Sequence, residues 1–242
     1  MDPSGVRHRA TDARVSLARR VVEHLGGRFS SELGIDVDAG EHEVERWFLA
    51  ATLFGTRIST SVAEGTFRVL DGAGLARIEQ ARHLPWEELV SLLDRGGYVR
   101  YDFRTATRLQ ALSTFVHEEY GGRVGALGSR YPRYEELRDA LDALPGWGPV
   151  TVGLFLRELR GVWPGAQAPL DQRAGRAATH LGLLAAVHDE DALERIRRLA
   201  RAAHLDVRDL ESGLVRLSLV HGAAIDRCPG EAHCTALAGQ AD

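Results

Sequence analysis

Apolar residues recur at spacings of three and four along nearly the whole chain, and this helical periodicity constrains the fold more than any other feature of the sequence. Such spacing places apolar side chains on one face of a helix, whereas the strict alternation of a half-buried strand is nearly absent here. The sequence therefore predicts an all-α protein. Helices are expected at residues 12–26, 42–54, 59–70, 76–82, 86–94, 102–119, 133–143, 149–160, 172–182, 191–204 and 209–220.

The basic residues of the 242-residue chain are 30 arginines, and there is no lysine. Without a side-chain amine the protein cannot form a lysine Schiff base, and it cannot contain the phosphate-binding lysine of a Walker-type loop. The net charge is −4, yet residues 95–178 contain 12 arginines and 9 acidic residues. A polyanionic partner is expected to contact this positive segment. A charge difference of this size also arises by chance.

Two of the expected helices, 133–143 and 149–160, are joined by a glycine-rich turn with the sequence Leu144-Pro145-Gly146-Trp147-Gly148-Pro149. The glycines permit positive φ and leave backbone N–H groups unobstructed, and proline suits the first turn of the second helix. A turn of this kind at a helix N-terminus can bind an anion. On spacing alone, an ordinary turn between two helices is an equal alternative.

Two segments together resemble the helix-hairpin-helix base-excision DNA glycosylases related to endonuclease III. Residues 144–151 are similar to that family's hairpin, and residues 169–176 are similar to its second motif, in which an Asp (here Asp171) opens a helix. The resemblance covers roughly residues 42–236, with further matching segments at 47–59 and 97–112 and around His221-Gly222.

The resemblance implies a two-lobed, all-α glycosylase fold with the site in the cleft between the lobes. One lobe is expected to comprise residues 38–162 and to carry the hairpin. The other is expected to comprise residues 1–37 and 163–242. The implied partner is double-stranded DNA that contains a damaged base, and the protein is expected to be a monomer.

The implied activity is that of a monofunctional DNA N-glycosylase, with Asp171 as the catalytic carboxylate. Its charge would stabilise the oxocarbenium-like sugar and orient the attacking water. Val150 stands where bifunctional members carry their lysine, so lysine-dependent strand cleavage is not expected. Ala50 stands where the adenine-specific branch carries a Glu, which leaves alkylated purines as the first guess. A simple helix cap is the alternative role for Asp171, and the two roles can coexist.

DNA contacts are expected for residues of the hairpin and for arginines elsewhere in the chain, namely Gly146, Trp147, Gly148, Val150, Thr151, Arg57 and Arg173, with Arg100, Arg104, Arg108 and Arg176 as further candidates. Surface ion pairs are the alternative for any single arginine. A flipped base needs a pocket, for which the candidates are Thr56, Tyr98, Trp47 and Val150. Core packing is the favoured alternative for Trp47. Trp147 either packs on its own domain or faces the minor groove.

The C-terminal segment resembles the family's iron–sulfur loop, but only Cys228 and Cys234 of the four expected cysteines are present. A [4Fe–4S] cluster requires four thiolates, so no cluster is predicted. His221 and His233 could complete a zinc site with the two cysteines. This site is disfavoured because His221 shares a face with Leu210, Leu214 and Leu217, and a packed loop is preferred. No metal or other cofactor is therefore predicted.

The N-terminal residues are polar and no segment approaches the roughly 20 apolar residues of a membrane span. With two cysteines and no disulfide framework, the expected location is cytoplasmic and associated with the nucleoid. The alternative function is a non-catalytic binder of damaged or abasic DNA that has kept the hairpin and lost base excision. A third reading is an all-α protein unrelated to DNA, for which both motifs would be coincidences.

Overall fold

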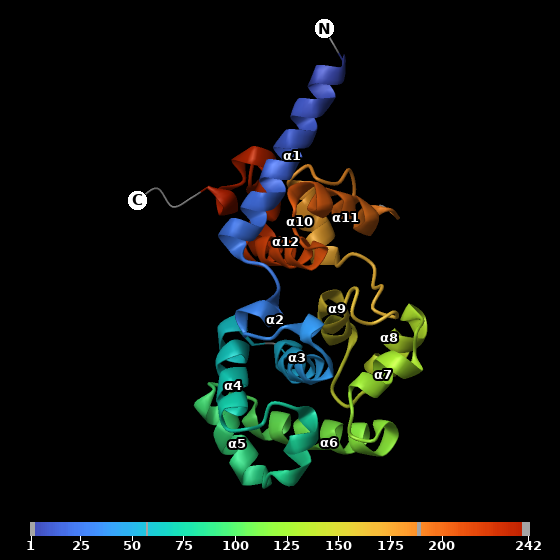
Figure 1. Ribbon diagram of the computed structural model, residues 1–242. Coiled ribbons are helices and arrows are strands. Elements are labelled where there is room, and N and C mark those ends of the chain that lie inside the picture. The colour runs from blue at the N-terminus through green and yellow to red at the C-terminus, as the bar shows by residue number, and fades with distance from the viewer. Residues whose placement is uncertain (1–2, 57, 188–189, 239–242) are drawn as a thin grey trace. The chain divides into compact units, whose positions relative to one another are not determined.

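The computed structural model describes residues 3–56, 58–187 and 190–238, and it confirms the all-α prediction, since these residues form helices and no strand. The chain divides into two compact units. We call residues 30–168 the hairpin unit, and residues 1–29 with 169–242 the terminal unit (Figure 1). The division assigns residues 30–37 and 163–168 to the hairpin unit, whereas the sequence placed them with the other lobe.

The hairpin unit is built around α3 (Glu41–Phe54), which packs against several neighbouring helices. The other elements are α2 (Phe29–Glu32), which begins at the boundary, η1 (Val37–Ala39), α4 (Thr60–Gly72), η2 (Ile78–His83), α5 (Trp86–Arg95), α6 (Asp102–Tyr120), α7 (Gly125–Arg130), α8 (Tyr134–Asp142) and α9 (Pro149–Glu158). Helix α3 contacts α4, α7 and α9, and its residues from Val44 to Leu53 are nearly all buried, as a central position requires.

An aromatic cluster fixes α3 to the hairpin helices. The Trp147 ring stacks on Phe48 with 4.5 Å between centroids, and Phe155 meets both rings edge-on. The fully buried Trp47 donates a hydrogen bond from Nε1 to the Phe155 carbonyl at 3.3 Å. The proposal that Trp47 lines a base pocket is therefore wrong, because its indole is enclosed in the core. Trp163 packs edge-on against Phe155 and extends the same cluster.

Two glycines permit close approaches that position the hairpin turn. A Cβ on Gly55, at the end of α3, would overlap the side chain of Thr151 at the start of α9. A Cβ on Gly146 would overlap the Arg108 side chain, and Gly146 also has a φ of 81°. A larger residue at either position would push the turn away from the helix that supports it.

The terminal unit is a second helical cluster with its own core. It contains α1 (Pro3–Leu25), α10 (Gln172–His180), α11 (Ala192–Ala203) and α12 (Val207–His221), followed by η3 (Gly222–Arg227), η4 (Glu231–His233) and η5 (Thr235–Leu237). Helix α12 contacts α1, α10 and α11. Among its buried core residues are Leu17, Val21, Ile196, Leu210, Leu214 and Leu217.

The long helices agree with the sequence prediction to within a few residues, apart from the first, which begins earlier. The short helices α2 and α7 were not predicted, because four and six residues are too few to show a helical period. Among the described residues, no helix combines the length and the apolar character that a membrane span requires.

Candidate functional site

The hairpin turn between α8 and α9 exposes backbone donors. Gly148 precedes α9 with an extended φ of −162°, and no described side chain caps this helix end. Pro149 has no N–H, and the first N–H groups of any helix lack intrahelical acceptors. A Cβ built on Gly148 would meet no atom within 4 Å, so the backbone here is open to a ligand. The turn therefore offers the anion-binding geometry expected from the sequence.

A pocket of about 550 Å³ lies beside this turn, entirely within the hairpin unit. It brings together the end of α3, the start of α6 and the turn itself. Its described lining is Gly55, Thr56, Tyr101, Arg104, Thr105, Arg108 and residues 146–151. Two arginines, Arg104 and Arg108, therefore line the same pocket as the open backbone of the turn, which is a combination suited to phosphate.

Exposed apolar side chains accompany these arginines. Val150 and Phe103 are each 60 % exposed, although side chains of this kind are usually buried. Phe103 lines an adjoining hollow of about 580 Å³ together with Arg104, Arg108 and Gly146. Apolar side chains that alternate with arginines are typical of surfaces that contact both the phosphates and the bases of a nucleic acid.

Thr56 lines the pocket beside the turn, whereas the side chain of Tyr98 lies behind Thr56. The Tyr98 hydroxyl donates to the Leu53 carbonyl at 2.8 Å and is hydrogen-bonded to the Thr56 hydroxyl. Burial raises the pKa of Tyr98 to about 12, so its hydroxyl remains protonated at neutral pH. Tyr98 is thus a support for Thr56, and its assignment to the pocket wall is corrected.

Two other predicted DNA contacts have side chains that point inward. The indole of Trp147 is buried in the aromatic cluster and donates a hydrogen bond from Nε1 to Thr52 Oγ1 at 3.1 Å. Of the two alternatives for Trp147, packing on its own domain is therefore correct. The Thr151 side chain is buried against Gly55. The Trp147 N–H already donates to the Leu144 carbonyl at 3.0 Å, so Trp147 offers no free backbone donor to a ligand either. Arg57 lies outside the described residues.

Asp171 belongs to the terminal unit and caps α10. Its Oδ1 accepts hydrogen bonds from the N–H groups of Arg173 at 2.7 Å and Ala174 at 3.3 Å. Its own N–H donates to Oε1 of the fully buried Glu211 at 3.2 Å. Asp171 therefore has the helix-cap role that is expected from the sequence as the alternative to catalysis. It holds the carboxylate in one orientation, which a catalytic role also requires.

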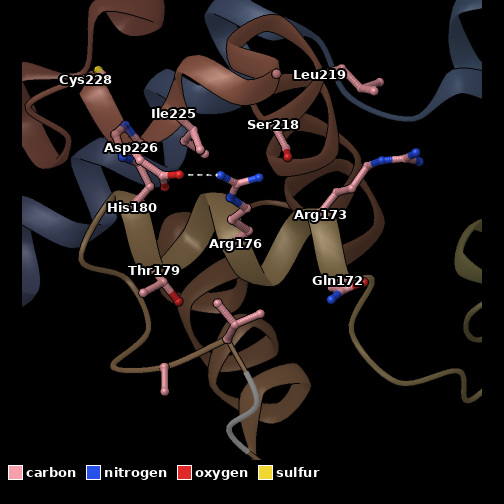
Figure 2. A pocket seen from close by; sticks show the side chains of 13 residues that line it. Gln172, Arg173, Arg176, Thr179, His180, Ser218, Leu219, Ile225, Asp226 and Cys228 are labelled. Atoms are coloured by element: carbon pink, nitrogen blue, oxygen red, sulfur yellow. Dashed lines mark hydrogen bonds and ion pairs between the residues drawn. The ribbon is translucent and has the colours of Figure 1, made fainter.

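A second pocket, of about 920 Å³, runs along α10 within the terminal unit (Figure 2). Figure 2 shows Arg176 reaching towards Asp226, with which it forms an ion pair at 2.8 Å, while the exposed Arg173 extends in a different direction. Arg173 is thus placed for contact with a ligand, whereas Arg176 already has an acidic partner. Asp171 is not among the described residues that line this pocket.

Four side chains of the types that ligate metals gather at the other end of α10, where the helix ends. They are His180, His221, Cys228 and Cys234, and one ligand atom of each lies within 4.8 Å of all the others. Burial raises the pKa of the Cys228 thiol, but hydrogen bonds from Thr235 and Gly230 and the contact with Cys234 outweigh it and lower the pKa. From the sequence, His221 and His233 are the candidate histidine partners of the cysteines, whereas the structure brings His221 and His180 to them.

The two cysteines of this cluster do not fit the iron–sulfur group of the resembled family, because a [4Fe–4S] cluster needs four thiolates. His180 was missed because it belongs to a different helix, far from the cysteines in the chain. Comparison with known proteins gives no family assignment, since no family model matches the sequence and no curated protein is significantly similar to it.

Proposed function

We propose that the protein is a monofunctional DNA N-glycosylase that removes a damaged base from double-stranded DNA, with an alkylated purine as the first candidate. The observation that carries this proposal is the uncapped start of α9, which adjoins a pocket that also contains Arg104 and Arg108. Base excision needs groups that bind the DNA phosphates and a carboxylate held in one orientation. The start of α9 with the two arginines is proposed for the first role, and Asp171 at the start of α10 for the second.

The hairpin is proposed to hold one DNA strand through its phosphates. The N–H groups of Gly146, Gly148 and Val150 would donate to phosphate oxygens, and the dipole of α9 would favour the negative charge. Arg104 and Arg108 would add charge-assisted hydrogen bonds. These contacts are independent of base sequence, so the hairpin would bring the enzyme to DNA without selecting the lesion.

Asp171 is proposed to act on the sugar of the flipped nucleotide. As the bond from C1′ to the base lengthens, positive charge develops on the sugar, and a carboxylate close to C1′ stabilises it. Water then bonds to C1′ and loses a proton, for which the carboxylate is the proposed acceptor, while the base leaves with the electron pair of the broken bond. The products are a free base and an abasic site.

Strand cleavage is not part of the proposed reaction, because the usual route to it requires an amine that forms a Schiff base with the abasic sugar. Val150 stands at the position where the resembled family carries its lysine, and the chain contains no lysine at any position. In structural terms we propose the two-lobed helix-hairpin-helix architecture, with the hairpin and Asp171 supplied by different units. The proposal requires both units to engage the same DNA molecule.

If Arg104 contacts a DNA phosphate, its removal will change the salt dependence of DNA binding. Arg104→Ala is expected to weaken duplex binding and to lower the slope of log affinity against log salt concentration by about one. The matched control is Arg138→Ala, because Arg138 lies on the same unit and already pairs with Asp139 at 2.7 Å. Fluorescence anisotropy over a salt series measures both. Equal slopes for the wild-type protein and Arg104→Ala would contradict the assignment.

The proposed activity is tested with a panel of duplexes that carry methylated, deaminated or oxidised bases. Release of the free base, measured by mass spectrometry, is expected for at least one lesion, with methylated purines tested first. The second candidate function is a non-catalytic binder of damaged or abasic DNA. It is favoured by one observation, namely that Asp171 already serves as a helix cap. Tight binding to the damaged duplexes without release of any base would select the binder.

A further inference from the structure

We propose that His180, His221, Cys228 and Cys234 form a structural zinc site in the terminal unit. The residue types are those of Cys₂His₂ zinc sites, and a set of two sulfur and two nitrogen ligands suits Zn²⁺ or an iron–sulfur centre, between which the ligand separations decide. The proposal is independent of the DNA glycosylase activity, because it concerns the folding of the C-terminal segment and not the reaction. It departs from the sequence prediction, which preferred a packed loop without metal.

The separations of the ligand atoms fit a single ion. Zn–S bonds of 2.3 Å and Zn–N bonds of about 2.0 Å place tetrahedral ligands roughly 3.3–3.8 Å apart. His221 Nε2 and Cys234 Sγ are 3.2 Å apart, and all four ligand atoms lie within 4.8 Å of one another. Small side-chain rotations therefore suffice to close the site. A larger iron–sulfur cluster would hold its ligands further apart, because its metals and sulfides lie between them.

One nitrogen of the cluster has an unmet bonding requirement. His180 Nε2 is buried, and no described group forms a hydrogen bond with it. A buried polar atom without a partner normally costs about 1–3 kcal/mol. A coordinated cation would remove this cost, since a neutral imidazole donates its lone pair to the metal. The nitrogen belongs to one of the four clustered side chains, which makes it an independent indication of a ligand.

The surrounding backbone also favours a cation. His180 is the last residue of α10 and His221 is the last residue of α12, so the negative ends of two helix dipoles lie at the cluster. The Thr235 N–H donates to Cys228 Sγ at 3.3 Å, which is the kind of outer hydrogen bond that supports a metal-bound thiolate. Gly230, with a φ of 75°, lets the loop between the cysteines approach the His180 carbonyl.

With four protein ligands the site is closed, which is the arrangement of structural rather than catalytic zinc. Its role would be to fasten the segment that contains η3, η4 and η5 to the ends of α10 and α12. This segment has short 3₁₀ helices, which supply little stability by themselves. The zinc ion would supply the cross-link that the packing of such a segment lacks.

The test measures metal in the full-length protein purified from zinc-supplemented cells. Elemental analysis is expected to find about one zinc ion per chain. Replacement by Co²⁺ is expected to give the visible absorption bands of tetrahedral cobalt with thiolate ligands. Free-thiol titration before and after metal removal should show that both cysteines are reduced. These measurements use the wild-type protein, so they do not depend on whether any variant folds.

The matched variants are His180→Gln and His233→Gln. Both remove one histidine of the terminal unit, but only His180 belongs to the cluster, whereas His233 is exposed. Zinc content is expected to fall by at least tenfold in His180→Gln and to remain at the wild-type level in His233→Gln. Cys228→Ser is expected to behave like His180→Gln, since a hydroxyl is a poor substitute for a thiolate.

Four results would overturn the proposal. The first is a wild-type protein that contains no zinc and shows no tetrahedral cobalt spectrum. The second is full zinc occupancy in His180→Gln, with or without loss in His233→Gln, because it would place the metal elsewhere. The third is iron with sulfide and the absorption of an iron–sulfur cluster. The fourth is a disulfide between Cys228 and Cys234 in the protein as purified under reducing conditions.

Discussion

Asp171→Asn is expected to lower the single-turnover rate of base release by at least about a hundredfold, while the protein stays folded and still binds DNA. Asparagine is as good a helix cap as aspartate, so its side-chain oxygen can keep the hydrogen bonds from the Arg173 and Ala174 N–H groups. With these cap hydrogen bonds kept, the substitution removes the negative charge of the carboxylate. The expected rate loss therefore reports stabilisation of the positively charged sugar rather than damage to α10.

The matched control for this variant is Asp206→Asn. Asp206 caps α12 in the same unit by accepting from the Arg208 N–H at 2.8 Å, and it has no proposed role in catalysis. Its variant should release the base at the wild-type rate. Rate measurements with enzyme in excess, together with thermal melting and anisotropy, separate the effects. An Asp171→Asn protein that releases the base as fast as the wild type would show that Asp171 is only a cap.

The effect of Asp206→Asn on the stability of the fold is expected to depend on pH. Burial raises the pKa of the Asp206 carboxyl, but hydrogen bonds and ion pairing with Arg208 outweigh it and hold the pKa below its usual value. Ionised Asp206 therefore stabilises the fold at neutral pH, and this stability is lost as the pH falls through the lowered pKa. Asp206→Asn should be less stable than the wild type at pH 7, with a smaller difference in acid.

Trp147→Ala is expected to destabilise the hairpin unit by about 3–5 kcal/mol, as is usual when a large buried aromatic is truncated. The substitution removes the stack on Phe48, the edge contact with Phe155 and the hydrogen bond to Thr52. Because Trp147 anchors the turn between α8 and α9, the variant should also lose affinity for duplex DNA. Urea unfolding followed by circular dichroism measures the stability, and anisotropy measures the binding.

Trp147→Phe separates packing from direct DNA contact. Phenylalanine can keep the ring contacts with Phe48 and Phe155 and loses only the hydrogen bond to Thr52, so a cost of about 1 kcal/mol is expected. Duplex affinity should then stay near the wild-type value. If Trp147→Ala were as stable as the wild type but failed to bind DNA, the indole would be a DNA contact and not an anchor.

Much of the fold could be predicted from the sequence because its long helices carry an unbroken apolar period. Helix α6 and helix α12 follow their predicted ranges within a few residues. The exact boundary between the units could not be predicted, since residues 30–37 and 163–168 have no strong period. Their assignment depends on long-range contacts, such as the hydrogen bond from the Ser30 N–H to Glu158 and the packing of Trp163 on Phe155.

The candidate sites also contain some residues that could be placed from the sequence and others that could not. The turn around Gly146 and Gly148 could be predicted because its glycines act through the backbone, which is a local property. The aromatic residues could not be placed, because a tryptophan or tyrosine suits a pocket wall and a core equally well. Trp47 and Tyr98 are held in the core by hydrogen bonds to partners distant in the chain, namely the carbonyl groups of Phe155 and Leu53 respectively. His180 gave no local signal at all.

We propose that this chain hydrolyses the base–sugar bond and leaves the strand intact, since it has no lysine for a Schiff base. The most direct measurement incubates the protein with an end-labelled duplex that contains a methylated purine and analyses the reaction on a denaturing gel with and without alkali. We expect a cleaved strand only after alkali, and no trapping of the protein on DNA by borohydride. Cleavage without alkali, borohydride trapping, or an intact strand after alkali for every lesion tested would contradict it.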